Sequence, residues 1–250
     1  MGFIDIPNLP QADVRLVLID GRTDGRIIGE LRARGVESIA TKAYPGLYSA
    51  ISHHPDIFLH PIGGDRIVYA PGISPETLTA LDGHGFCLIR GAAELGSRYP
   101  MNIAFNVARV GHFAIHNFRY TDPVVLEELK KLEVELINVK QGYAKCSVSV
   151  VDEKSIITSD KGIARAADKK GMDVLLIEPE RGIRLPGLDM GFIGGSTGLL
   201  GRHQWAVTGD LDSLKSGPEI RAFLLSRNIE PVCLSPEQIV DVGSILPIQI

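Results

Sequence analysis

The sequence has few cysteines, a single tryptophan and no long apolar run. Its three cysteines are an odd number and include no Cys-x-x-Cys pair. This usage argues against a disulfide framework or a zinc knuckle and suits a reducing compartment. No apolar stretch approaches the roughly 18 residues of a membrane span, and the opening residues lack a basic segment followed by an apolar one. We therefore expect a cytoplasmic protein without a membrane partner.

The sequence also lacks blocks of one charge. Its net charge of −4 comes from 26 basic and 30 acidic residues that are interspersed along the chain. No electrostatic stripe for a phosphate backbone results, so a nucleic acid is not an expected partner. With 44% apolar and 22% charged residues in 250 positions, the composition is that of a folded globular protein with a sizeable core.

An internal repeat dominates the rest of the sequence. The order strand, strand, helix, strand recurs four times, with starts about 45 residues apart. The four complete units cover residues 56–91, 102–140, 146–179 and 191–234. Unrelated strand and helix elements are not expected to show such regular spacing.

The two ends of the chain supply the parts of a further unit. Residues 13–42 read as strand, helix and strand without a first strand, and residues 239–250 read as a strand without a following helix. Joined, they complete a fifth unit and remove the open sheet edges between first and last units. We predict a single α/β domain over residues 1–250, a five-bladed α/β-propeller of ββαβ units. An open doubly wound sheet leaves the C-terminal strand unexplained.

Polar residues recur on one face of the predicted first strands. If these segments alternate as strands do, small and polar side chains face the axis of the ring, and Cys146 falls with Val148 and Val150 on the other face. The predicted inner set comprises Asp56, His60, Asn102, Asn106, Lys145, Ser147, Ser149 and Asp241. Such convergence indicates either a ligand site or an interior filled by hydrogen-bonded side chains and water.

Three segments resemble a known family. They are "HPDIFLHP" (54–61), "YAKCSVSVVDEKSIITS" (143–159) and "VDVGSILPI" (240–248). In order and spacing they are similar to the guanidino-group-modifying enzymes of the pentein fold, which include dimethylarginine dimethylaminohydrolases, arginine and agmatine deiminases and amidinotransferases. The resemblance covers nearly the whole chain.

The resemblance implies a chemistry for which key residues are missing. In the family, carboxylates hold a planar guanidinium, a thiolate attacks its central carbon and a histidine moves the proton. Here Tyr143 stands where the histidine is expected, and Ser244 lies in the stretch where the cysteine is expected. His60 stands roughly where an acidic residue is expected. These departures predict a catalytically degraded protein without a cofactor.

The predicted ligand is small and polar or cationic. Asp56 and Asp241 are the expected partners of an amine or guanidino compound, with Tyr143 among the residues of the same site. Two alternatives stay open. One is an active hydrolase in which Cys146 is a relocated nucleophile working with His60 or His116 and an aspartate, and the other is a non-catalytic module that binds a protein partner.

Other candidate motifs have simpler interpretations. His112 and His116 lie four apart on a predicted strand, about 13 Å from each other, which is too far for a shared metal ion. Cys87 and Cys233 lie in apolar closing strands, where we expect them to pack. The segment "GFIGGSTGLLG" (191–201) lacks the spacing of a phosphate loop, so its glycines are expected to allow close packing near the axis.

Overall fold

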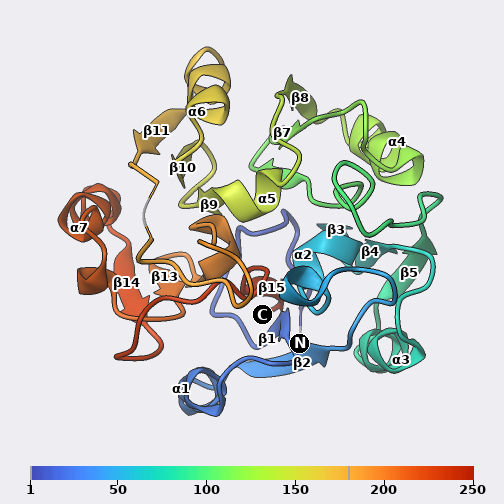
Figure 1. Ribbon diagram of the computed structural model, residues 1–250, viewed down its shortest axis with the longest axis horizontal. Helices are drawn as coiled ribbons and strands as arrows, with labels where there is room; N and C mark the ends of the chain where they lie inside the picture. Colours follow the sequence, from blue (N-terminus) through green and yellow to red (C-terminus); the bar gives the residue numbers. More distant parts are fainter. Residues whose placement is uncertain (1, 180) are drawn as a thin grey trace.

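The computed structural model describes residues 2–179 and 181–250, which form a mixed α/β fold with five three-stranded sheets. In each sheet the middle strand is antiparallel to one neighbour and parallel to the other. A helix connects each pair of parallel strands, and Figure 1 shows the five sheets around the centre of the molecule with these helices at the periphery.

Four of the sheets follow the predicted units along the chain. The second unit contains β3 (Leu59–Gly63), β4 (Arg66–Tyr69), α3 (Pro75–Gly83) and β5 (Cys87–Arg90). The third contains β6 (Ala108–Val110), β7 (Phe113–His116), α4 (Pro123–Lys131) and β8 (Glu135–Asn138). The fourth contains β9 (Val148–Val150), β10 (Ser155–Thr158), α6 (Lys161–Asp168) and β11 (Asp173–Leu176). The last contains β12 (Thr197–Gly201), β13 (Gln204–Val207), α7 (Gly217–Leu225) and β14 (Glu230–Cys233), with the short helix η3 (Leu211–Ser213) before α7.

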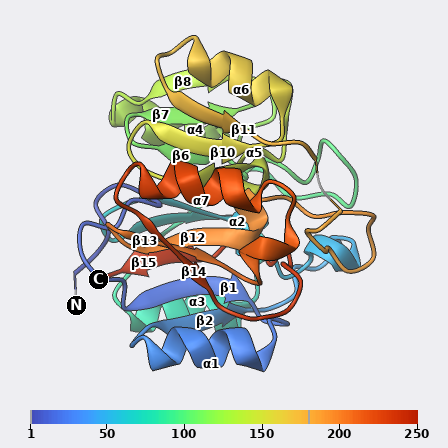
Figure 2. The ribbon, with the colours of Figure 1, turned by 90° about the vertical axis from the view of Figure 1, so that its left-hand side faces the viewer.

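The remaining sheet combines the two ends of the chain, as the sequence predicts. Its members are β1 (Leu16–Asp20), α1 (Gly25–Ala33), β2 (Glu37–Thr41) and β15 (Leu246–Gln249). β1 pairs antiparallel with β15 and parallel with β2. Gly2 and Ile250 also exchange two backbone hydrogen bonds of 2.9 Å, and the two termini lie together in Figure 2.

Two of the peripheral helices begin with a capping side chain followed by proline. The side chains of Ser74 and Asp122 accept hydrogen bonds from backbone N–H groups in the first turns of α3 and α4. Pro75 and Pro123 follow them, at positions where the missing N–H costs no intrahelical bond.

The starts of the first strands are not where the sequence predicts them. Four segments form short helical turns just before or beside the inner strands, namely η1 (Ser49–Ile51), α2 (Pro55–Phe58), α5 (Ala144–Ser147) and η2 (Gly194–Ser196). Asp56, Lys145, Cys146 and Ser147 therefore lie on helical turns rather than on strands. The prediction that they alternate between two faces is wrong for these residues, whereas His60 and Ser149 do lie on strands.

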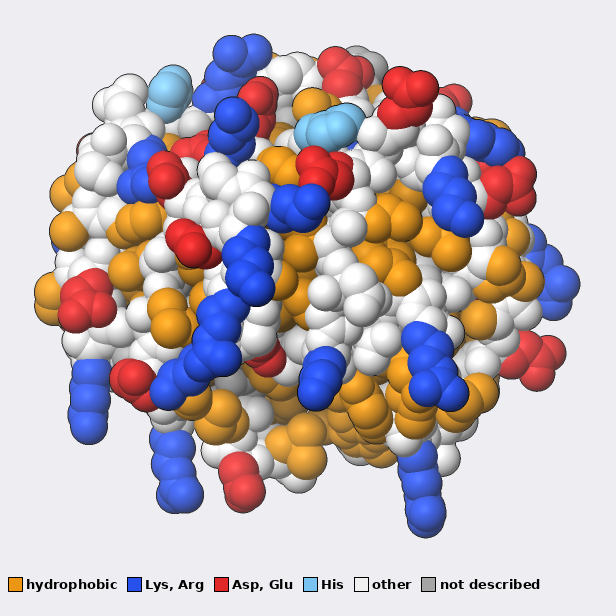
Figure 3. All heavy atoms as spheres, turned by 90° about the horizontal axis from the view of Figure 1, so that it is seen from above, with side chains coloured by type: hydrophobic (Ala, Val, Ile, Leu, Met, Phe, Trp, Pro, Cys, Tyr) orange, Lys and Arg blue, Asp and Glu red, His pale blue; other side chains and the backbone are white. Residues whose placement is uncertain are grey.

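The surface carries both signs of charge. On the face in Figure 3, acidic and basic side chains are interspersed with neutral and apolar ones. Within residues 2–179 and 181–250, no helix is long and apolar enough to cross a membrane.

Candidate functional site

A buried polar cluster lies where α2, α5 and the C-terminal segment meet. The carboxylate of Asp56 on α2 accepts hydrogen bonds from the Ser244 hydroxyl, at 2.7 Å, and from the Cys146 thiol, at 3.3 Å. Ser244 in turn accepts a bond of 2.9 Å from the Lys145 ammonium. All four residues are buried. The cluster therefore joins three segments that are far apart in the sequence.

Asn106 holds the two helical turns of this cluster together. Its side-chain oxygen accepts bonds from the backbone N–H groups of Lys145, at 2.9 Å, and Cys146, at 3.3 Å. Its amide nitrogen donates to the backbone oxygen of Asp56, at 2.8 Å, and to the sulfur of Cys146, at 3.2 Å. Because one buried amide serves both α2 and α5, Asn106 fixes the position of Asp56 relative to Cys146.

Cys146 is buried, but it does not point away from the polar interior. The prediction that its sulfur lies with Val148 and Val150 outside the polar set is wrong, because α5 replaces the strand at this position. Burial raises the pKa of the Cys146 thiol well above its ordinary value, and the negative charge of Asp56 raises it further. The thiol therefore stays protonated and donates to a carboxylate, which is the opposite of an activated thiolate.

Lys145 and Ser244 form a buried pair that balances the charge of Asp56. The ammonium group also donates to the backbone oxygen of Gly194, at 3.3 Å. Burial lowers the pKa of Lys145, while the nearby Asp56 opposes that shift. Ser244 has a positive φ of 74°, an uncommon conformation for a residue other than glycine. The residue with this uncommon backbone conformation is the same serine that contacts Asp56 and Lys145.

Asp241 lies on the η2 side of the cluster. It accepts hydrogen bonds from the backbone N–H groups of Phe192, at 2.9 Å, and Gly243, at 3.0 Å. Burial raises the pKa of its carboxyl group. The Nδ1 atom of His54 is 3.7 Å from one Asp241 oxygen, and its Nε2 atom is 3.7 Å from an oxygen of Asp20. His54 thus lies between two carboxylates that come from opposite ends of the chain, without a hydrogen bond from Nδ1 to Asp241.

Glycines allow η2 to approach this cluster, as the sequence predicts. A Cβ atom on Gly195 would lie 2.1 Å from an Asp241 oxygen, and one on Gly194 would lie 2.4 Å from the backbone oxygen of Lys145. A Cβ atom on Gly198 would lie 2.0 Å from the backbone oxygen of Ile245. The glycines of residues 191–201 therefore serve close packing.

Aromatic side chains surround Tyr143 beside the cluster. The Tyr143 hydroxyl donates to the side-chain oxygen of Asn102, at 3.0 Å, and lies 3.4 Å from the hydroxyl of Tyr48. The ring centroids of Phe192 and Tyr99 are 6.3 Å and 5.8 Å from that of Tyr143. Burial raises the pKa of Tyr143, so this phenol is not a proton acceptor near neutral pH. These aromatic residues form a partly exposed patch that we call the tyrosine cover. It consists of Tyr48, Tyr99, Tyr143 and Phe192.

Several buried polar atoms near the cluster have no hydrogen-bond partner. Among the site residues that the structure describes they are Asp56 Oδ1, His54 Nδ1, His60 Nε2, Asn102 Nδ2 and Ser147 Oγ. Buried polar atoms are nearly always paired in folded proteins, and each unpaired one costs about 1–3 kcal/mol. Groups of this kind are therefore candidates for contact with a ligand or water.

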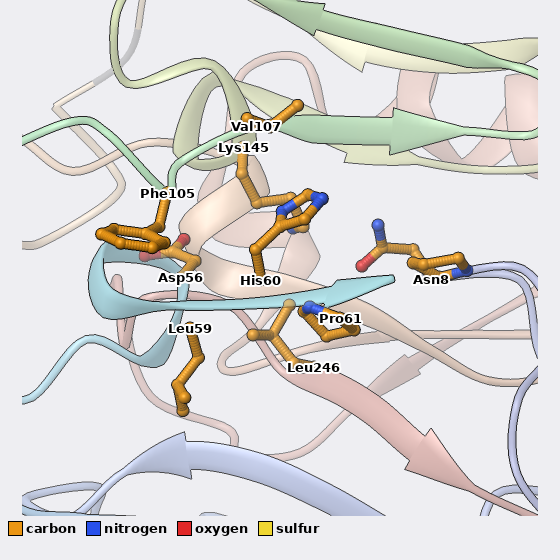
Figure 4. A pocket seen from close by; sticks show the side chains of 10 residues that line it. Asn8, Asp56, Leu59, His60, Pro61, Phe105, Val107, Lys145 and Leu246 are labelled. Atoms are coloured by element: carbon orange, nitrogen blue, oxygen red, sulfur yellow. The ribbon is translucent and has the colours of Figure 1, made fainter. Parts of the chain in front are cut away.

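His60 lines a narrow cavity behind Asp56. Figure 4 shows His60 between Asp56 and Asn8, with Lys145 beside its ring. The cavity has a volume of about 10 Å³, which is room for a single water-sized species. Burial lowers the pKa of His60 to about 3, and the nearby Arg109 and His116 contribute to the shift. His60 is therefore neutral at physiological pH.

The Cys146 thiol contacts an aspartate, Asp56, but neither His60 nor His116 is among its hydrogen-bond partners. The ring of His116 bonds to Thr121 Oγ1, at 2.6 Å, and to the backbone oxygen of Gly142, at 2.9 Å. Burial lowers its pKa to about 4.

The other two cysteines differ in exposure, since Cys233 is half-buried and Cys87 is exposed. The prediction that Cys87 packs is wrong, because β5 is an outer strand with its ends open to solvent.

The structure brings together most of the predicted residues and adds several more. Asp56, Asn106, Lys145 and Asp241 lie in or against one cluster, and Asn102 and Tyr143 border it. Tyr48, His54 and Phe192 belong to the same region but come from irregular segments whose sequence carries no periodic signal. No group of three or more His, Cys, Asp and Glu side chains able to hold a metal ion occurs within the described part of the chain.

Solved structures with the same fold are guanidino-group-modifying enzymes. An inosamine-phosphate amidinotransferase from Streptomyces griseus matches with a TM-score of 0.58 and 8% identity, covering 100% of both chains. A dimethylarginine dimethylaminohydrolase from Pseudomonas aeruginosa, a cysteine-to-serine variant in complex with citrulline, matches at 0.54 and 8% identity, covering 92% of this chain and 93% of its own. An agmatine deiminase from C. jejuni matches at 0.54 and 9% identity, covering 93% and 90%.

The protein therefore has the fold of the pentein superfamily of guanidino-group-modifying enzymes. Residues 18–246 match the model of a family of unknown function (DUF6873), and the chain belongs to this family. No curated protein matches the sequence.

Proposed function

We propose that this protein binds a small cationic amine or guanidino compound at Asp56 and does not hydrolyse it. The observation that carries the proposal is the buried, unpartnered Oδ1 atom of Asp56, which lies in the same region as the unpartnered amide nitrogen of Asn102. A ligand that donates to Asp56 and accepts from Asn102 satisfies both groups. Charge-assisted bonds between a guanidinium and a carboxylate are among the strong hydrogen bonds in proteins.

The tyrosine cover suits the same ligand class. The electron-rich faces of Tyr48, Tyr143 and Phe192 attract cations, and the cation gains most where water is excluded. The cavity that reaches Asp56 has room for only a water-sized species. Access of a guanidino compound to Asp56 therefore requires the residues that surround this carboxylate to move apart.

The absence of hydrolysis follows from the protonation states in the cluster. The Cys146 thiol has a raised pKa and donates to Asp56 rather than to a histidine. Tyr143 cannot shuttle a proton near neutral pH, because its pKa is also raised. In two of the structural neighbours, a cysteine-to-serine variant is described in complex with citrulline or with substrate. A serine in place of a cysteine is thus compatible with ligand binding in this fold, and here Ser244 stands in the terminal segment.

The finer architecture forms part of the proposal. We take the five sheets to be the blades of an α/β-propeller, closed by the pairing of β1 with β15. The contacts of inner strand β12 with both β9 and β15 support this arrangement. In such a ring the Asp56 cluster lies on the axis.

Calorimetric titration with arginine, agmatine and methylated arginines tests the proposed function, with product analysis on the same samples. We expect binding without turnover, weakened at least about tenfold by Asp56→Asn, because one charge-assisted bond contributes about 1.5–3 kcal/mol. Asp82→Asn, on the exposed face of α3, is the matched control. Turnover that disappears in Cys146→Ala would establish the active hydrolase instead. Absence of binding to every compound would favour the protein-interaction module.

A further inference from the structure

Three buried residues meet around Gly243. The backbone N–H of Asp56 donates to the backbone oxygen of Gly243, at 3.4 Å, and the Gly243 N–H donates to Asp241 Oδ1, at 3.0 Å. A Cβ atom on Gly243 would lie 2.3 Å from the Cβ atom of His54, so only glycine leaves room for the histidine there. Asp56 and Asp241 are therefore held next to each other, with His54 packed against the residue between them.

Two of the three buried carboxylates in this region already face a positive charge. Asp20 is 4% exposed and pairs with Arg22, at 2.6 Å. Asp56 is 2% exposed, and its Oδ2 atom accepts from Ser244, which in turn accepts from the Lys145 ammonium. Arg22 and Lys145 therefore account for the charges of Asp20 and Asp56.

The third carboxylate, Asp241, faces only a histidine. Over the residues that the structure describes, its single partner within ion-pair distance is His54, whose Nδ1 atom is 3.7 Å from Oδ1 and has no hydrogen-bond partner. A buried charge without a counter-charge is costly, so a proton on this pair keeps the region neutral. Burial raises the pKa of the Asp241 carboxyl group, and the charge of Asp56 adds to the shift, in agreement with a retained proton.

Most other titratable groups around this pair do not exchange protons near neutral pH. Burial lowers the pKa of His53 and raises the pKa values of Tyr48 and Cys146, which keeps all three predominantly neutral. Burial also lowers the pKa of Lys145, so its ammonium group is the alternative source of a proton. The charged and titratable groups that face Asp241 and His54 are Asp20, Arg22, Tyr48, His53, Asp56, Lys145 and Cys146.

We propose that the site exchanges its ligand for a proton: when a cation binds to Asp56, the proton shared by Asp241 and His54 is released to solvent. This inference rests on the proposed function and adds a regulation of the same site. The bound cation supplies the positive charge that the proton supplies in the ligand-free protein, so the region is neutral in both states. By linkage, the affinity for the cation rises with pH as long as the pair holds its proton.

Calorimetric titration of the protein with agmatine, in phosphate and in Tris buffer at neutral pH, tests the exchange. The two buffers differ in their enthalpy of ionisation, so a released proton makes the observed heats differ. The amine and guanidino groups of agmatine stay charged between about pH 6 and 8, so the ligand supplies no proton. We expect about 0.3–1 proton released per agmatine, and a Kd that falls by at most about tenfold for each pH unit.

Variants identify the source of the proton. Asp241→Asn and His54→Gln should each reduce the release to near zero, whereas Asp82→Asn and His112→Gln, at exposed positions, should retain it. If Asp241→Asn does not fold, His54→Gln serves as the second variant, and the comparison of buffers with the wild-type protein decides by itself.

The outcomes separate this inference from the proposed function. Binding of agmatine with equal heats in both buffers would overturn the proton exchange and leave the proposed function standing. Release that persists undiminished in both variants would assign the proton to Lys145 and would also overturn the exchange at Asp241 and His54. Absence of agmatine binding in every buffer would overturn both proposals.

Discussion

Ser244 donates a hydrogen bond of 2.7 Å to the carboxylate of Asp56, although one residue lies near the end of the described chain and the other in its first quarter. The contact exists because β15 joins β1 in one sheet and so brings the C-terminal segment back to α2. Lys145 donates to the same serine, while the second carboxylate oxygen of Asp56, Oδ1, has no partner.

Replacement of Ser244 by alanine should destabilise the protein. The change removes the donor to Asp56 and the acceptor for Lys145 while leaving both charges buried, so we expect a loss of about 2–3 kcal/mol in the free energy of unfolding. Urea unfolding measures this difference. Ser226→Ala, at an exposed serine after α7, should change the value by no more than about 0.5 kcal/mol. Equal effects of the two substitutions would contradict the role given to Ser244.

The three thiols should react with alkylating agents in the order of their exposure. We expect Cys87 to react first, Cys233 next and Cys146 last, at least about tenfold more slowly than Cys87, because its thiol is buried and its pKa is raised. Mass spectrometry of peptides after timed iodoacetamide labelling at neutral pH gives the three rates. Rapid labelling of Cys146 in the folded protein would show an activated thiolate and would revive the hydrolase alternative.

The protein should lose stability below about pH 6.5 through its buried histidines. The pKa values of His60 and His116 in the folded state are lowered to about 3 and about 4, so the unfolded chain binds protons that the native state does not. The stability that these residues contribute is present above the unfolded pKa and is lost as the pH falls. The loss is at most about 1.4 kcal/mol per pH unit for each histidine. The raised pKa of Asp241 acts in the opposite sense, since a carboxyl group that keeps its proton in the native state favours folding at low pH.

Denaturant unfolding between pH 4.5 and 7.5 measures this dependence. His60→Gln should reduce the slope of the free energy of unfolding against pH by up to about 1.4 kcal/mol per pH unit, the contribution of one histidine. His112→Gln, at an exposed histidine, should leave this slope unchanged. A slope that is identical in all three proteins would show that His60 titrates normally.

Two glycine substitutions should have opposite effects. Gly198→Ala places a Cβ atom 2.0 Å from the backbone oxygen of Ile245, so β12 and the C-terminal segment must separate. We expect a loss of about 1–3 kcal/mol or more. Gly29→Ala lies in the middle of α1 with no atom near the added carbon, and should increase stability by about 0.5–1 kcal/mol. Thermal unfolding of both variants distinguishes them, and a stabilised Gly198→Ala would contradict the close packing described.

The repeat made the number and order of the sheets predictable from the sequence. Each unit has its own strands and helix, and the helices α3 and α4 begin with a polar cap and proline, at Ser74 and Asp122; these signals are local. The pairing of β1 with β15 was also predictable, because each end lacks what the other supplies. The number and order of the sheets follow from the repeated sequence pattern, and the pairing of the two chain ends follows from the avoidance of open sheet edges.

The site was less predictable because four-residue turns carry little periodic signal. Over so few residues, the alternation of Lys145, Ser147 and Ser149 is compatible with a strand and with a turn followed by a strand. Pro55 at the start of α2 was an available cue for a helical turn, but α5 has no such residue. The orientation of the Cys146 side chain then depends on Asn106, which accepts a hydrogen bond from the Cys146 backbone and donates one to its sulfur. This is a tertiary contact, so the local sequence does not reveal it.

The shared sheet of the two chain ends also affects synthesis. When the ribosome makes this protein, β1 emerges early, and its antiparallel partner β15 follows only after the strands of all four other sheets. Until then, one side of β1 offers unpaired backbone groups to any extended segment nearby, including one from another nascent copy. A factor that shields this strand during translation would improve the yield of correctly assembled molecules.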